Sequence, residues 1–152
     1  MPNRFDRITN YLVVPLKGAA TERTVKCEYF LKKGQDWIAV APDKLRSDPQ
    51  DIVCLSQPPY EEAVKFVPDA DPCLQLFAGV AKTRNADHAM PNLMAADKGA
   101  IVVALYPKSN RSLILIFQRC TSDTDFGELV ATTDPEIHNG TDGLPGDGGD
   151  PR

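Results

Sequence analysis

The segment Ala100-Ile101-Val102-Val103-Ala104-Leu105-Tyr106 is one of the two longest apolar runs in the chain, and Leu113-Ile114-Leu115-Ile116-Phe117 is the other. The polar residues Pro107 to Arg111 connect them. Short apolar runs without alternation are typical of strands that are buried on both faces. We therefore expect these two segments to be neighbouring strands at the centre of a sheet.

The segment Thr24 to Lys32 has the clearest period of two residues, as in a strand with one face buried. Lys33 to Asp36 supplies a glycine-containing turn, and Trp37 to Ala41 follows as a second strand, so we predict a hairpin. Four further segments have strand character: Tyr11 to Leu16, Ile52 to Leu55, Leu74 to Ala81 and Gly127 to Thr132.

Two short helices are also predicted. The first follows Leu55, because Ser56 or Gln57 can cap a helix whose first turn holds Pro58 and Pro59. The second runs from about His88 to Lys98, with Asp87 as its N-cap and Gly99 just beyond its end.

These elements predict an α+β domain over residues 1–133. We expect a mainly antiparallel sheet of about six or seven strands, with the two helices packed on one face or end. Residues 134–152 are rich in glycine, proline and aspartate and contain few large apolar residues. Such a segment buries too little surface to offset its ordering entropy, so we expect a flexible acidic tail.

The charge distribution bears on possible partners. The net charge is −4, and residues 134–152 alone account for it, with five acidic residues against one arginine. The remaining body is neutral, which argues against nucleic acid as a partner. No apolar run approaches the ~20 residues of a membrane helix. Met1 to Arg7 leads into no apolar segment typical of a signal peptide, so we expect a cytoplasmic protein.

Common cofactor and metal motifs were sought along the whole chain. The sequence has no glycine-rich nucleotide-binding motif, and its four cysteines include no Cys-x-x-Cys pair. We therefore expect no cofactor and no metal, with all four cysteines as free thiols in a reducing compartment.

Cys73 and His88 form the candidate catalytic pair. A cysteine nucleophile needs a base to generate its thiolate, and Cys73 precedes a strand that is followed by His88. The other histidine, His138, lies in the predicted tail, where we expect nothing to fix its geometry. The segment Cys73-Leu74-Gln75-Leu76-Phe77-Ala78-Gly79, followed by His88, resembles the cysteine-strand-histidine order of toxin-type glutamine deamidases. Those enzymes place a small residue before the cysteine, whereas this chain has Pro72.

Trp37 is the candidate partner-binding residue, because an exposed tryptophan can anchor a protein partner. The alternative is that Trp37 closes one end of the core. The leading hypothesis is a non-enzymatic accessory, adaptor or immunity-type factor that binds another protein. A cysteine-dependent amidohydrolase or deamidase using Cys73 and His88 is the first alternative, and a structural subunit of a larger assembly is the second.

Overall fold

Strands dominate the part of the chain that the computed structural model describes, which is residues 8–18, 24–47, 52–82, 93–105, 109–120, 127–133 and 135–139. The strands are β1 Ile8–Pro15, β2 Cys27–Lys33, β3 Asp36–Val40, β4 Leu45–Arg46, β5 Ile52–Ser56, β6 Leu74–Ala81, β7 Leu93–Ala95, β8 Ala100–Ala104, β9 Ser109–Arg119, β10 Leu129–Ala131 and β11 Glu136–Asn139. The helix of this described part is α1, Tyr60–Phe66.

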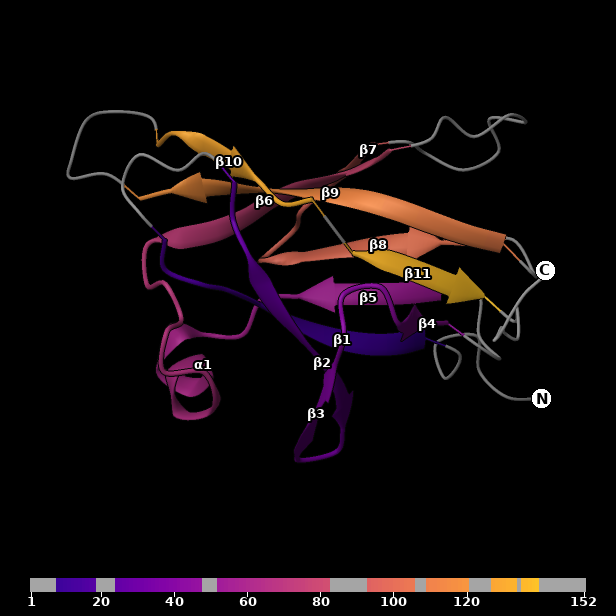
Figure 1. The fold of residues 1–152 in the computed structure, drawn as a ribbon, viewed down its shortest axis with the longest axis horizontal. Helices are drawn as coiled ribbons and strands as arrows, with labels where there is room; N and C mark the ends of the chain where they lie inside the picture. The colour runs from indigo at the N-terminus through magenta and orange to yellow at the C-terminus, as the bar shows by residue number, and fades with distance from the viewer. Residues whose placement is uncertain are drawn as a thin grey trace.

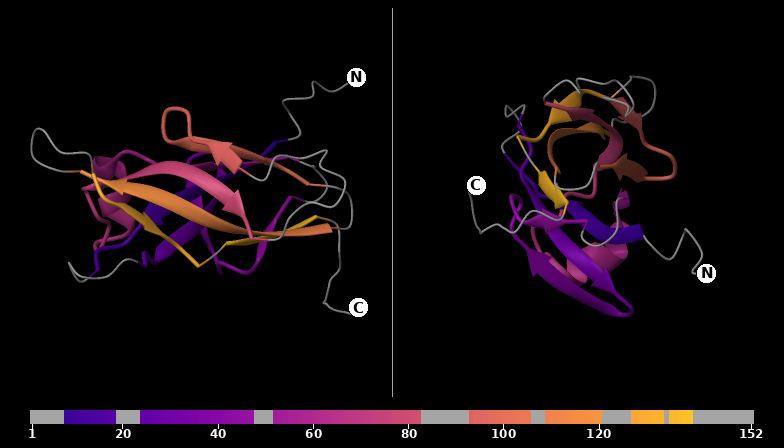
Figure 2. Two further views of the ribbon diagram at one scale, coloured as in Figure 1. Left: turned by 90° about the horizontal axis from the view of Figure 1, so that it is seen from above. Right: turned by 90° about the vertical axis from the view of Figure 1, so that its right-hand side faces the viewer.

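The strands form two sheets (Figure 1). The first has the order β3-β2-β1-β5-β8, and the second has the order β4-β11-β9-β6-β7, with β10 also paired to β9. Most pairs are antiparallel, but β1 runs parallel to β5 and β4 runs parallel to β11. The view along the long axis shows the strands curving round, with the β2–β3 ribbon extending away from them (Figure 2).

The long strand β9 organises the second sheet. One of its edges pairs with β6 from Leu113 to Arg119. Its other edge pairs first with β11 and then with β10. Between these two, Thr132 closes the gap: its N–H donates to the Leu115 carbonyl at 2.9 Å, and its hydroxyl accepts the Leu115 N–H at 2.9 Å. From Leu113 to Arg119, β9 is therefore held from both sides.

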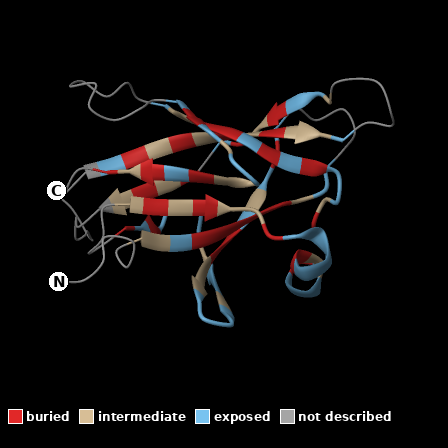
Figure 3. Cartoon of the chain, turned by 180° about the vertical axis from the view of Figure 1, so that it is seen from behind, coloured by how far each residue is buried: buried red, intermediate tan, exposed pale blue. Residues whose placement is uncertain are grey.

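The main core lies between the two sheets. Every second residue of β9 faces it, and Leu113, Leu115 and Phe117 are completely buried. Buried and partly exposed positions alternate along most strands, as Figure 3 shows. Gly79 on β6 has a specific role here, because a Cβ at this position would lie 2.6 Å from the Ile101 side chain of β8. The absence of a side chain lets the two sheets approach each other at this point.

A second, smaller core lies on the other face of β1. Tyr11 and Val13 face the main core, whereas Leu12 and Val14 pack with Phe30 in the second cluster. The remaining members of that cluster are Ala63, Val67 and Ala70, from α1 and the segment after it. Because α1 covers this face, residues on both faces of β1 are buried.

Polar side chains join the first sheet to the second. The Tyr11 hydroxyl on β1 donates to the Arg46 carbonyl on β4 at 2.9 Å and accepts the Arg46 N–H at 2.8 Å. The Gln57 amide, at the end of β5, donates to the Leu74 carbonyl at 2.6 Å and accepts the Leu76 N–H at 2.7 Å. Gln57 was expected near the start of α1 as a possible cap, but its side chain bonds to β6 instead.

The prediction of an α+β fold with two helices is wrong, because the described chain is mostly β-sheet with one short helix. The first predicted helix is confirmed as α1. The second, expected from His88 to Lys98, is not formed over Leu93–Ala95, which is strand β7. The cross-strand partners of β7 are Ala78 to Val80 on β6, and this pairing overrides the local helix signals. Residues 88–92 lie outside the described part.

The prediction of a central hairpin from Ala100 to Phe117 is also wrong. β8 pairs with β5 in the first sheet and β9 belongs to the second sheet. Neither strand is buried on both faces along its length, and Val102 is 56% exposed. The hairpin of β2 and β3 is confirmed.

The prediction of a flexible tail is wrong for the first part of residues 134–152. Glu136–Asn139 form β11, whose Ile137 is completely buried. A single large apolar residue therefore suffices to dock this segment, because β9 and β4 supply hydrogen-bond partners on both of its edges. The rest of the predicted tail, residues 140–152, lies outside the described residues.

The alternation along β9 gives a first prediction. Leu115→Ala should lower the free energy of unfolding by roughly 2–5 kcal/mol, because it removes a completely buried side chain from the main core. Ile114→Ala, one residue away on the opposite face, should cost less. Urea denaturation of both variants measures this difference, and equal costs would contradict the assignment of faces.

The Tyr11 hydroxyl gives a second prediction. Tyr11→Phe should cost about 1–3 kcal/mol of unfolding free energy, because it leaves the Arg46 N–H and carbonyl without this partner. Burial raises the pKa of Tyr11 above its usual value of 10.0, although the contacts with Arg46 oppose the rise. The folded protein therefore holds this proton more tightly, so the contribution of Tyr11 to stability is present below pH 10 and is lost as pH rises through the raised pKa. Denaturation curves between pH 8 and pH 11 should show that the free energy of unfolding falls more in the wild type than in Tyr11→Phe. An equal fall in both proteins would contradict this prediction.

Candidate functional site

Trp37 lies on β3 and packs in a row of aromatic rings. Its ring stacks on that of Phe66 from α1, with centroids 4.1 Å apart and an interplanar angle of 18°. On β2, Phe30 lies 5.5 Å away at a tilted angle, and the Lys32 ammonium lies 5.7 Å from the Trp37 ring centroid. Trp37 is half-buried against the second core cluster, so it both closes that cluster and keeps part of its ring accessible.

Exposed apolar side chains adjoin Trp37. Phe66 is 51% exposed on the same face as Trp37, whereas Ile38, the next residue on β3, is 46% exposed on the opposite face. We call Trp37 and Phe66, together with the outer edge of β3, the Trp37 surface. Sequence analysis singled out Trp37 but missed Phe66, because only the packing of α1 beside the β2–β3 ribbon brings their rings together.

Cys73 and Cys120 form a disulfide, with their Cα atoms 4.9 Å apart. The expectation of four free thiols is therefore wrong for this pair, whereas Cys27 and Cys54 are not disulfide-bonded. Cys73 immediately precedes β6 and Cys120 immediately follows β9. The antiparallel pairing of Leu74 with Arg119 brings the two sulfurs together, and the Cys120 N–H also donates to the Cys73 carbonyl at 2.7 Å.

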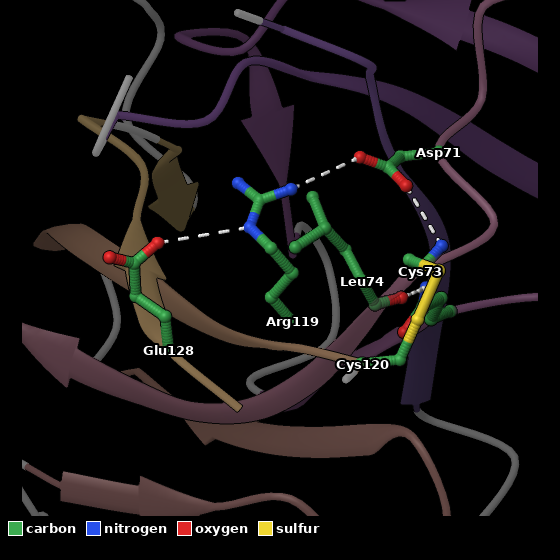
Figure 4. A network of polar contacts seen from close by, with 7 residues as sticks. Asp71, Cys73, Leu74, Arg119, Cys120 and Glu128 are labelled. Carbon is green, nitrogen blue, oxygen red and sulfur yellow. Dashed lines mark hydrogen bonds and ion pairs between the residues drawn. A yellow bond between two sulfur atoms is a disulfide. The ribbon is translucent and has the colours of Figure 1, made fainter. Parts of the chain in front are cut away.

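A polar network surrounds this disulfide (Figure 4). The Arg119 guanidinium lies between two carboxylates, with Nη1 3.8 Å from Asp71 Oδ2 and Nε 3.8 Å from Glu128 Oε1. The other oxygen of Asp71, Oδ1, accepts the Cys73 N–H at 2.8 Å. Gly127 allows the chain to pass here, because a Cβ at this position would lie 1.7 Å from the Arg119 carbonyl oxygen. The network joins β6, β9 and the segment before β10.

The structure does not show a catalytic pair of Cys73 with His88. The Cys73 sulfur is bonded to Cys120, so it has no thiol to ionise in this state. His88 lies outside the described residues. Burial raises the pKa of the Cys54 thiol, which disfavours its thiolate as well.

His138 is held in place, contrary to the expectation for a flexible tail. It lies on β11, with Nδ1 3.0 Å from Asn110 Oδ1 and Nε2 3.0 Å from the Asp43 carbonyl oxygen. The Glu136 carboxylate lies 3.2 Å from Nε2. Both ring nitrogens therefore lie within hydrogen-bond distance of oxygen atoms. These contacts join β11 to β9 and to the turn before β4.

The described ranges between residues 8 and 139 hold neither a metal-binding cluster nor a membrane-spanning helix. No group of three or more histidine, cysteine, aspartate or glutamate side chains lies close enough together there to hold a metal ion. No helix in these ranges is both long enough and apolar enough to span a membrane.

The disulfide gives a third prediction. Its reduction should lower the free energy of unfolding by about 2–4 kcal/mol, because it closes a loop of 47 residues in the unfolded chain. Thermal melting with and without a reductant measures the effect. Iodoacetamide added to the unfolded, unreduced protein should modify two cysteines and, after reduction, four. Modification of all four without reduction would contradict the bond.

Comparison with known proteins adds no relative from which a function can be transferred. No family model matches this chain, and no curated protein matches it.

Proposed function

We propose that this protein is a non-enzymatic accessory, adaptor or immunity-type factor that binds another protein through the Trp37 surface. The proposed occupant is an extended segment of the partner that adds a strand to the outer edge of β3. The observation that carries the proposal is the position of a half-exposed tryptophan, stacked on an exposed phenylalanine, on a strand at the end of its sheet.

The edge of β3 supports this mode of binding. β3 is the last strand of the first sheet, and within the described residues it pairs with β2 alone. Proteins commonly protect such edges with charged residues, proline or bulges. From Trp37 to Val40 the strand has none of these, and Ile38 and Ala39 are exposed. An accessible row of backbone N–H and carbonyl groups is the element used in binding by strand addition.

The aromatic side chains beside that edge favour a specific contact. Tryptophan contributes strongly to protein interfaces because it buries a large rigid area with little loss of conformational entropy. Stacking on Phe66 restricts the orientation of the Trp37 ring before a partner arrives. The Lys32 ammonium near that ring adds a cation–π contact that further restricts it.

The alternatives are less well supported. A deamidase using Cys73 and His88 requires reduction of the disulfide before Cys73 can act as a nucleophile. No observation on the described residues specifically favours the hypothesis of a structural subunit. The cytoplasmic location remains a prediction, and the disulfide weighs against it, because disulfides persist mainly in oxidising compartments.

A binding experiment with point variants tests the proposal. A partner is isolated from the native host on immobilised wild-type protein, purified, and titrated by calorimetry against the variants. Phe66→Ala should weaken its binding about tenfold or more, because truncation of a central anchor residue costs about 2 kcal/mol or more and tenfold is about 1.4 kcal/mol. Ile38→Lys should also weaken binding, because it places a charge on the edge strand. Trp37→Ala is informative only if its melting temperature is preserved, since Trp37 also packs on the second core cluster.

Phe77→Ala is the matched control. Phe77 is 49% exposed, close to the value for Phe66, but lies on β6 in the other sheet. This variant should bind the partner as the wild type does. The proposal is wrong if Phe66→Ala and Ile38→Lys retain full affinity, or if Phe77→Ala loses as much affinity as they do.

A further inference from the structure

A small cavity lies beside the Arg119 network, away from the Trp37 surface. It has a volume of about 200 Å³. The segment after β1 and the segment before β2 supply Lys17 and Lys26, and the opposite wall is formed by Asp71, Leu74 and Arg119. We call it the Arg119 pocket. It is large enough for a small polyatomic ion and too small for most drug-sized ligands.

Positive charge predominates in this pocket. Three cationic side chains line it, Lys17, Lys26 and Arg119, against the single carboxylate of Asp71. Glu128, which contacts Arg119 from outside the lining, still leaves an excess of positive charge. Within the described part of the chain, Lys17 and Lys26 have no ion pair of their own. Three cations gathered in one pocket, in a body that is neutral over residues 1–133, form a local site for an anion.

The hydrogen-bond donors of Arg119 are poorly used by the protein. Both of its ion pairs measure 3.8 Å, which is beyond hydrogen-bond distance. Among the described residues, the buried Nε atom has no hydrogen-bond partner. A buried donor without a partner is costly. A guanidinium presents five N–H donors in a fixed planar arrangement. A tetrahedral oxyanion supplies acceptor oxygens that fit two of these donors at once.

From these observations we propose that the Arg119 pocket binds a phosphate group. A phosphate carries a charge of about −1.5 to −2 at neutral pH. This charge is close to the excess of two positive charges on the lining residues, which are three cations against Asp71. Arginine suits bidentate recognition of phosphate oxygens, and lysines contribute as point charges. The phosphate is either a free anion or part of a phosphate monoester. This inference is independent of the proposed binding at β3.

The disulfide holds the wall of the pocket in place. Leu74 is adjacent to Cys73, and Arg119 is adjacent to Cys120, so the covalent bond fixes the separation of the two lining residues. Asp71 is anchored to the same turn by its hydrogen bond from the Cys73 N–H. A site whose supporting residues are fixed in advance loses less entropy when a ligand binds.

Titration followed by NMR tests the proposal on the intact oxidised chain at constant ionic strength. The probes are inorganic phosphate, glycerol 3-phosphate and, as a carboxylate, acetate. We expect saturable shifts of the Lys26, Arg119 and Cys120 amides with a phosphate probe and not with acetate. Lys26→Gln and Arg119→Gln should each weaken binding by about tenfold, the usual effect of removing one charged hydrogen-bond partner.

Lys44→Gln is the matched control, because it removes the same charge from an exposed position outside the pocket. It should bind phosphate as the wild type does. Tighter binding of inorganic phosphate assigns the pocket to the free anion, and equal or tighter binding of glycerol 3-phosphate assigns it to a monoester. The proposal is overturned if no phosphate probe saturates, if acetate binds equally well, or if folded Lys26→Gln binds phosphate like the wild type.

Discussion

The pairing of β9 on both edges is the constraint on which the rest of this fold depends. Leu113 to Arg119 pair with β6 along one edge, and β11 and β10 pair along the other edge, so three segments distant in sequence are fixed by one strand. Its alternate residues form the centre of the main core. Because backbone pairing and core packing use the same residues, the register of β9 determines the placement of both its neighbours and the opposite sheet.

One of the two candidate sites is a consequence of that register. At one end of β9 the pairing of Leu74 with Arg119 joins Cys73 to Cys120 and holds the Arg119 guanidinium between Asp71 and Glu128. The Trp37 surface depends on the first sheet instead, in which α1 covers β1 and leaves β3 at the edge. The two sites have different chemistry. The first is charged and enclosed, whereas the second is apolar and lies along an open strand.

Local signals in the sequence predicted several elements correctly. The hairpin of β2 and β3 follows from the alternation of Thr24 to Lys32 and the turn residues Lys33 to Asp36, and α1 follows from the signals of Pro58 and Pro59. No local signal in the sequence predicted the disulfide between Cys73 and Cys120. Its 47 residues of separation are closed by the pairing of β6 with β9, and sequence spacing says nothing of which strands pair.

The amino-acid sequence by itself determined where most strands lie, because alternation and turn residues act over a few neighbouring positions. Tertiary structure decided the rest. In the apolar run from Ala100, Ile101 and Val103 of β8 face the main core, whereas Val102 points to the opposite face and is exposed. In contrast, β1 is covered on both faces because α1 packs on it. Leu93–Ala95 became a strand because β6 offered an open edge, and Glu136–Asn139 docked because β9 and β4 did. Each of these outcomes depends on a partner distant in the chain, and local propensity is too weak to oppose the hydrogen bonds and burial that such a partner supplies.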